Sequence, residues 1–346
     1  MSQLDEEEIT LKKNTIKNFR ILFFIIACCL LTACGSGGNS NINNSSPQPT
    51  SQGTNFLILG DNGTIANYNI SSDQINSVSE SMTPVAFFDA ESVSGNLIIS
   101  GVGGMYNFST QDGKLKFERK SISGDPHLRL YRILHANGKF VTVGNIDPIN
   151  TLIAYSDDGE SWVYSGESTI GQLTGIAYSN NKFIAVGPTY YSLMYTSITG
   201  DSWSTVTSPI FSLDITNGAG RFVMIGTEGT VATSLNFESW EHEHTVTKNN
   251  LIRVVYGNGK FVAVGKNGTI ISSNDGKSWS LESSVSTDNL NSIAYGDNHF
   301  VAVGNQGTII TSIDGKVWKK LSPPNNLKVN YYGIKYTGLP LIKIYK

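Results

Sequence analysis

The sequence predicts an all-β fold built from seven copies of one repeated unit, and three observations lead to this prediction. A short apolar run ending in glycine recurs at intervals of 39 to 43 residues, and its glycines are Gly60, Gly101, Gly144, Gly187, Gly226, Gly265 and Gly304. All five tryptophans follow the later glycines in one register, each with a serine six residues before it; they are Trp162, Trp203, Trp240, Trp279 and Trp318. After residue 54, no stretch of useful length has the periodicity of an amphipathic helix.

Each copy is expected to form four strands. In the last copy these are residues 290–296, 299–304, 307–312 and 316–321, which are short apolar runs separated by Gly, Asn and Asp. Four-stranded units of about 40 residues that stack around an axis are the blades of a β-propeller. The predicted architecture is therefore a seven-bladed β-propeller of four-stranded antiparallel blades over residues 54–346. Eight blades are the alternative, because residues 340–346 resemble one further second strand.

The two ends of the repeat region are complementary. The first copy begins at its second strand, with Phe56, whereas residues 332–336 near the C-terminus match the first strand of a unit. We therefore expect the last strand to complete the first blade, which would leave no unpaired sheet edge at the junction.

The N-terminal segment predicts export and a lipid anchor. Basic residues precede the apolar run 21–31, which is too short to span a bilayer and is typical of a secretory signal. The run ends in Leu31-Thr32-Ala33-Cys34, which resembles the lipobox of bacterial lipoproteins; an ordinary signal cleavage site is the alternative. The resemblance implies that residues 1–33 are removed, that Cys34 is acylated, and that the protein is anchored in the bacterial cell envelope. The resemblance also implies the outer membrane, because Gly35 rather than an aspartate follows the cysteine. Residues 34–53, which are uncharged, are expected to be a flexible tether.

Three segments of the repeat carry a family resemblance, namely residues 155–162, 272–279 and 311–318 (YSDDGESW, SSNDGKSW and TSIDGKVW). They resemble the Asp-box, or bacterial neuraminidase repeat, with the pattern Ser/Thr-x-Asp-x-Gly-x-Ser/Thr-Trp. The resemblance places the pattern's hydroxyl at Thr196, Thr233, Ser272 and Thr311, and its acid at Asp157 or, as an amide, Asn274. At the acid's position the other copies have Ile198, Leu235 and Ile313. Residues 256–279 are also similar to the propellers of the photosystem II assembly and stability factor family. The Asp-box resemblance implies a structural role for the five tryptophans.

Composition narrows the function. A net charge of −3 gives no basic excess for non-specific nucleic-acid binding. The three cysteines all precede residue 35, so the propeller has no disulfide or cysteine metal site, and no cofactor or metal is expected. A sialidase-like glycoside hydrolase is the alternative, but the five arginines after residue 34 lack the spacing of that family's arginine triad. We therefore expect a non-catalytic propeller that binds a protein or a glycan, in the manner of an assembly or scaffold factor.

Candidate binding residues come from loop lengths and from one strand register. The turns between the second and third strands are longer in the third and fourth copies, where they contain Asp147, Tyr190 and Tyr191. Arg132, Asp214 and Arg253 share a polar register of the first strand, which is expected to border the central channel. Loops on a rigid scaffold are where binding sites concentrate. We predict a partner-contacting patch on the face that carries the second-to-third and fourth-to-first strand loops.

Overall fold

The computed structural model describes residues 55–79, 84–93, 96–111, 114–120, 122, 127–146, 150–165, 169–323 and 328–338. These residues belong to one compact unit, Ser51–Lys346. The expected signal segment, Cys34 and the tether lie outside the described residues. Among the described residues, no helix is long and apolar enough to cross a membrane.

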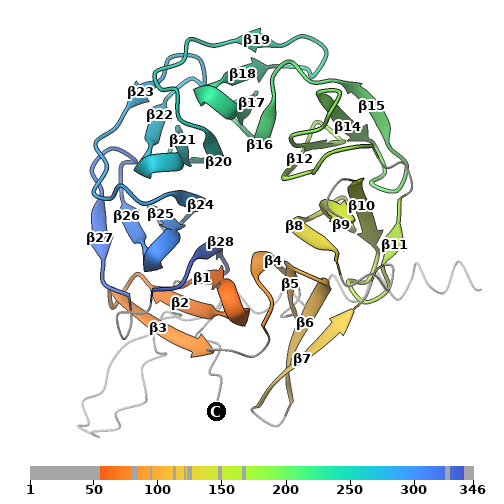
Figure 1. Cartoon of the computed structure of the whole chain (residues 1–346), viewed down its shortest axis with the longest axis vertical. Helices are drawn as coiled ribbons and strands as arrows, with labels where there is room; N and C mark the ends of the chain where they lie inside the picture. Colours follow the sequence, from red (N-terminus) through yellow and green to blue (C-terminus); the bar gives the residue numbers. More distant parts are fainter. Residues whose placement is uncertain are drawn as a thin grey trace, which may run out of the picture. The chain divides into compact units, whose positions relative to one another are not determined.

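Seven four-stranded antiparallel sheets surround a central channel, which confirms the predicted seven-bladed propeller (Figure 1). Blades 1 to 3 consist of β28 (Tyr331–Tyr336), β1 (Asn55–Gly60), β2 (Ile65–Asn69) and β3 (Gln74–Ser79); β4 (Phe87–Val93), β5 (Asn96–Gly101), β6 (Gly104–Gln111) and β7 (Lys114–Lys120); and β8 (Arg129–Ala136), β9 (Lys139–Ile146), β10 (Asn150–Ser156) and β11 (Val163–Tyr164). Blades 4 and 5 consist of β12 (Gly175–Ser179), β13 (Lys182–Val186), β14 (Leu193–Ser197) and β15 (Ser204–Thr207); and β16 (Ser212–Gly218), β17 (Arg221–Gly226), β18 (Val231–Ser234) and β19 (Glu241–His242). Blades 6 and 7 consist of β20 (Leu251–Gly257), β21 (Lys260–Gly265), β22 (Ile270–Ser273) and β23 (Ser280–Leu281); and β24 (Leu290–Gly296), β25 (His299–Gly304), β26 (Ile309–Ser312) and β27 (Lys319–Leu321).

The C-terminal strand closes the ring, as the sequence predicts. Strand β28 is the innermost strand of blade 1 and pairs antiparallel with β1, with Ile58 opposite Ile334. Both isoleucines are buried in the core shared by blades 7 and 1. The seven sheets and their cores are thus built from residues of this one unit, so the ring is a self-contained folding unit.

The repeated glycines have one common cause, which is the close approach of two strands within a blade. A Cβ atom added to Gly265 would lie 2.0 Å from the carbonyl oxygen of Asn250, and one added to Gly304 would lie 2.0 Å from that of Asn289. In each case the end of the second strand passes against the backbone at the start of the first strand. Only glycine leaves room for this contact.

The tryptophans lie in the turns between the third and fourth strands. In blade 7, the amide N–H of Gly315 donates to Ser312 Oγ over 2.9 Å, and those of Lys316 and Val317 donate to Asp314 Oδ1 over 2.9 Å each. Trp318 Nε1 donates to the carbonyl oxygen of Gly315. The indole packs against β21 of the preceding blade, which places it in the core between the two blades.

This geometry corrects the residue assignment taken from the Asp-box pattern. The hydroxyl and the acid that close the turn are Ser312 and Asp314, each one residue later than the pattern places them. Thr311 instead donates to the carbonyl oxygen of Phe300 on the neighbouring strand. Successive side chains along an extended chain point to opposite sides. With Ser312 and Asp314 directed into the turn, Ile313 between them points to solvent, and 63% of its surface is exposed.

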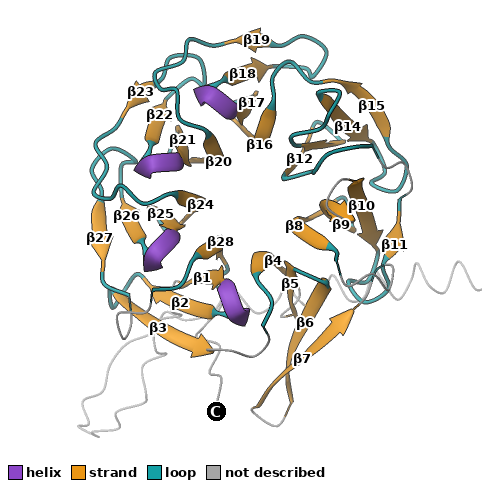
Figure 2. Ribbon diagram, in the orientation of Figure 1, coloured by secondary structure: helices purple, strands orange, loops and turns teal. Residues whose placement is uncertain are grey.

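The strands alternate in direction within each blade, so the ring has two distinct faces. The loop face carries the second-to-third and fourth-to-first strand loops, including the four 3-10 turns η1 (Asp61–Gly63), η2 (Thr227–Gly229), η3 (Lys266–Gly268) and η4 (Asn305–Gly307), drawn purple in Figure 2. The turn face carries the first-to-second and third-to-fourth strand turns, including those with tryptophan.

Candidate binding site

The channel opens on the loop face into a cavity of about 460 Å³. Its wall is formed where the innermost strands begin, and these strands share an irregularity there. The pairing register shifts by one residue in β4, β8, β16, β20, β24 and β28, which leaves one residue of each strand without an opposite partner. A bulge of this kind turns a side chain out of the sheet plane. The bulged residues all line the cavity: Phe88, Tyr131, Leu213, Ile252, Asn291 and Tyr332.

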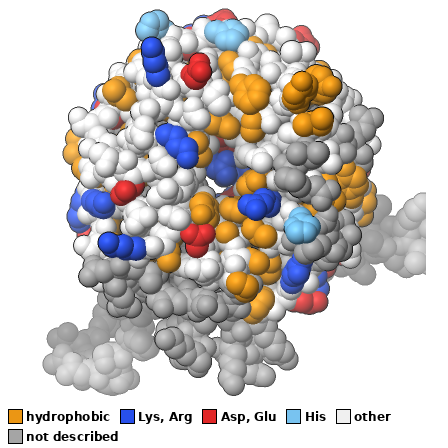
Figure 3. Space-filling model, in the orientation of Figure 1, with side chains coloured by type: hydrophobic (Ala, Val, Ile, Leu, Met, Phe, Trp, Pro, Cys, Tyr) orange, Lys and Arg blue, Asp and Glu red, His pale blue; other side chains and the backbone are white. Residues whose placement is uncertain are grey.

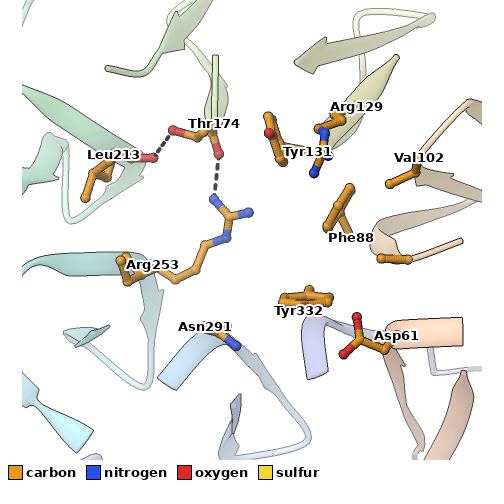
Figure 4. Close-up of a pocket in the computed structure, with 12 residues that line it drawn as sticks. Asp61, Phe88, Val102, Arg129, Tyr131, Thr174, Leu213, Arg253, Asn291 and Tyr332 are labelled. Atoms are coloured by element: carbon orange, nitrogen blue, oxygen red, sulfur yellow. Dashed lines mark hydrogen bonds between the residues drawn. The ribbon is translucent and has the colours of Figure 1, made fainter. Parts of the chain in front are cut away.

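Three of the bulged residues are aromatic and lie together at one side of the mouth, in the adjacent blades 1, 2 and 3 (Figure 4). The ring centroid of Phe88 is 5.2 Å from that of Tyr131 and 5.6 Å from that of Tyr332. Burial raises the pKa of both tyrosines further above neutral pH, where a tyrosine is uncharged in any case. The three rings form an apolar wall that is open to solvent through the mouth.

Arg253 lies opposite the aromatic wall, and its guanidinium points toward the middle of the mouth (Figure 4). Its Nη1 atom donates to the carbonyl oxygen of Thr174 over 2.5 Å and lies 3.6 Å from Asp214 Oδ1. The residue is 7% exposed, and its Nε has no hydrogen-bond partner among the described residues. Burial, together with the nearby charge of Arg132, lowers the pKa of Arg253 to about 10. The mouth therefore combines an apolar wall with a charged donor that is only partly satisfied.

Three residues predicted to border the channel lie along it, but their contacts differ; they are Arg132, Asp214 and Arg253. Asp214 is fully buried, and its Oδ2 accepts the backbone N–H of Val254 over 3.0 Å, so it links blades 5 and 6. Asp89, which the sequence analysis did not single out, does the same for blades 2 and 3 through the N–H of Ile133. Arg132 lies 3.6 Å from Asp89 and lines a second cavity, of about 320 Å³, at the turn-face end of the channel. Of the three predicted residues, only Arg253 lines the mouth.

Tyr190 and Tyr191, two of the predicted loop residues, lie on the rim of the loop face rather than in the mouth. Tyr190 and Tyr191 are 71% and 63% exposed, and their rings are nearly perpendicular with centroids 5.0 Å apart. The N–H of Tyr190 donates to the carbonyl oxygen of Ile170, which joins this loop to blade 3. Figure 3 shows hydrophobic side chains on the rim above β14 and basic side chains at the central hollow. Asp147 lies outside the described residues.

The aromatic wall is the feature that the sequence analysis missed. Phe88, Tyr131 and Tyr332 each stand one residue before the polar register that was selected. The position one residue before this polar register is aromatic in three of the seven units, and this is the sequence signal that could have revealed the wall. The signal points to the mouth only when the bulge is known, because a regular strand would direct these side chains into the interface between sheets.

Comparisons with known proteins place the fold. The chain matches no protein-family model and no curated protein. Among solved structures, it is similar to one described as YCF48 bound to D1 peptide, with a TM-score of 0.56 and 17% identity over 72% of this chain and 85% of that chain. It is also similar to YCF48 from Cyanidioschyzon merolae, with a TM-score of 0.53 and 16% identity over 71% of this chain and 87% of that chain. The chain therefore has the fold of the YCF48 propellers, which confirms at the level of fold the resemblance carried by residues 256–279.

Proposed function

We propose that this protein is a non-catalytic propeller that binds a segment of a partner protein at the loop-face mouth of its channel. The observation that carries the proposal is the wall of Phe88, Tyr131 and Tyr332 facing the buried guanidinium of Arg253. Half-buried aromatic rings that line a cavity can accept an apolar side chain of a ligand, and aromatic residues are frequent anchors at protein interfaces. A guanidinium beside them can donate to a main-chain carbonyl or a carboxylate of the same segment.

A polypeptide ligand is favoured over a glycan by the fold comparison, because the similar YCF48 propeller has been solved with a peptide. Binding is favoured over hydrolysis by the composition of the mouth. Glycosidases ordinarily use two carboxyl groups that flank the scissile bond. Asp61 is the one acidic side chain among the described residues that line the cavity.

The rim tyrosines extend this proposed surface. Tyr190 and Tyr191 lie on the same face as the mouth, and their exposure leaves both rings available to a longer partner. We propose that a bound segment runs from the mouth across the rim of blade 4. By holding such a segment, this protein acts as an assembly or scaffold factor.

The binding proposal is tested by selecting peptides from a random displayed library on the purified propeller. Phe88→Ala is expected to weaken a selected peptide by at least about tenfold, the effect typical of an interface aromatic. The double change Tyr190→Ala with Tyr191→Ala tests the rim, and Val317→Ala on the turn face is the control. Normal binding by Phe88→Ala, with a wild-type melting temperature, would show that the mouth is not the site. Loss only in the double tyrosine variant would place the site on the rim alone.

We also propose that the propeller is held at the bacterial envelope by lipid on Cys34, with the outer membrane as the expected location. The support is the sequence Leu31-Thr32-Ala33-Cys34 at the end of the apolar run. Two acyl chains give stable attachment where a single chain gives only marginal binding. Metabolic labelling with a fatty-acid analogue should mark the wild-type protein and not Cys34→Ala. Equal labelling of that variant would refute the anchor.

A further inference from the structure

Three turns on the turn face present an aliphatic side chain to solvent at the same position. Ile198, Leu235 and Ile313 each follow the serine that closes the tryptophan turn, and they are 67%, 61% and 63% exposed. Turn tips are normally polar, as the corresponding Asp157 and Asn274 are in blades 3 and 6. One exposed aliphatic residue would need no explanation. Three in one register, on one face of a ring, indicate a common environment.

Further apolar surface lies beside the turn of blade 7. Val317, in the same turn as Ile313, is 76% exposed. Both residues line a cavity of about 540 Å³ between blades 7 and 1, together with Ile70 of blade 1. This depression arises where blade 1 has Tyr68 in place of the serine that closes a tryptophan turn.

Three lysines on this face form ion pairs. Lys277 pairs with Glu241, Lys319 pairs with Asp73, and Lys139 Nζ lies 2.7 Å from Asp157. These ion pairs do not account for the aliphatic side chains at the shared turn position, which are therefore the feature of this face that needs an explanation.

The chain also enters the propeller on the turn face. Strand β1 begins at Asn55, which is opposite Asn69, the residue that leads into the third-to-fourth strand turn of blade 1. The N–H of Thr337, just after the last strand, donates to the carbonyl oxygen of Asn55 over 3.1 Å, so the chain leaves on this face as well. Residues 35–53, the expected tether between Cys34 and the propeller, therefore join the ring on the turn face, opposite the candidate binding site. A flexible chain of that length reaches about 24 Å, which does not orient the ring by itself.

We propose that the turn face rests on the surface of a phospholipid bilayer, with Ile198, Leu235, Ile313 and Val317 inserted at the level of the headgroups. This proposal rests on the lipid anchor proposed above, which would bring the bilayer to this side of the ring. The contact holds the channel mouth and the rim tyrosines away from the membrane, where they are accessible to a partner.

The test replaces the natural anchor so that it does not depend on Cys34. Residues 35–346, with a hexahistidine tag at the N-terminus, are bound to vesicles of phosphatidylethanolamine, phosphatidylglycerol and a nickel-chelating lipid. This chain contains no cysteine. A single cysteine introduced by Ile313→Cys or Leu235→Cys therefore carries a polarity-sensitive dye at one known place. Lys266→Cys, in η3 on the loop face, is the matched control.

The dye at residues 313 and 235 is expected to shift its emission to shorter wavelength and to be quenched by spin-labelled lipid, whereas the dye at residue 266 stays in water. A dye introduced by Asn274→Cys reports the face without removing an aliphatic residue. Its quenching should be lost when Ile198, Leu235 and Ile313 are all changed to Ser, with the melting temperature unchanged because these side chains are exposed. Each such change should weaken the contact by about threefold to tenfold, as loss of partial aliphatic burial predicts.

Two results would overturn the proposal. If every dye stays in water while the protein is bound to the vesicles, the ring stands off the bilayer on its tether. If the dye at residue 266 is quenched and that at 313 is not, the loop face is the one that contacts lipid. Failure of the lipid anchor itself appears separately, as acyl labelling that does not depend on Cys34.

Discussion

Trp318 provides a direct test of how the blades are held together. The side chain is 5% exposed and packs against Val262 and Val264 of the preceding blade and Phe300 of its own. A buried aromatic side chain removes about 150–250 Å² from water, which at about 25 cal/mol per Å² amounts to roughly 4–6 kcal/mol. Alanine keeps the Cβ atom and the site relaxes in part, so we expect Trp318→Ala to lower the free energy of unfolding by about 3–5 kcal/mol.

Trp240 is the matched control, because it occupies the same turn position in blade 5 but is only half-buried. Trp240→Ala should cost less than Trp318→Ala, since less apolar surface leaves water there. Urea unfolding followed by far-ultraviolet circular dichroism measures both variants without relying on tryptophan fluorescence. The dependence on urea should match the wild type if both variants unfold in one step. A loss below about 1 kcal/mol in Trp318→Ala, a typical value for an ordinary substitution, would contradict the burial argument. A larger loss in Trp240→Ala would do the same.

Three further predictions concern ring closure, acid stability and strand packing. Ile334→Ala should cost about 2–5 kcal/mol in urea unfolding, because this buried residue of β28 closes the ring; an unchanged midpoint would mean that the ring is open in solution. The backbone N–H groups of Ser161 and Glu160, with the hydroxyl of Ser156, lower the pKa of Asp158 to about 2. The stability this gives is present above the unfolded pKa of about 3.9 and is lost as the pH falls toward 2, so Asp158→Asn should flatten unfolding free energy against pH in that interval. Gly265→Ala should lower the melting temperature more than Gly259→Ala. At Gly259 a new Cβ atom meets open space, and only the positive φ opposes it, at a cost of about 1–2 kcal/mol. Equal shifts in melting temperature would contradict the explanation by close approach of two strands.

The repeat by itself determined the architecture of this protein. Glycine is required where two strands meet too closely for a side chain, and this requirement recurs in all seven units. Tryptophan packs from a turn into the core between two blades, and it recurs in five units. Each requirement is local, because the contacts that impose it come from the same blade or the next one. The closing strand could also be predicted from sequence, since residues 332–336 match a first strand that the N-terminal copy lacks.

The candidate site is formed only in the folded ring and could not be predicted from the sequence. Phe88 and Tyr332 are far apart in sequence and meet only because the ring closes. They face the mouth because a bulge shifts the pairing register of their first strands by one residue, which is a property of the paired strands in the folded ring. The same long-range packing gives Asp214 a structural role, since its carboxylate is occupied by an N–H of the neighbouring blade. Repetition in the sequence reports the contacts that every blade shares, whereas a binding site is formed by side chains that differ between blades and converge only when the ring is complete.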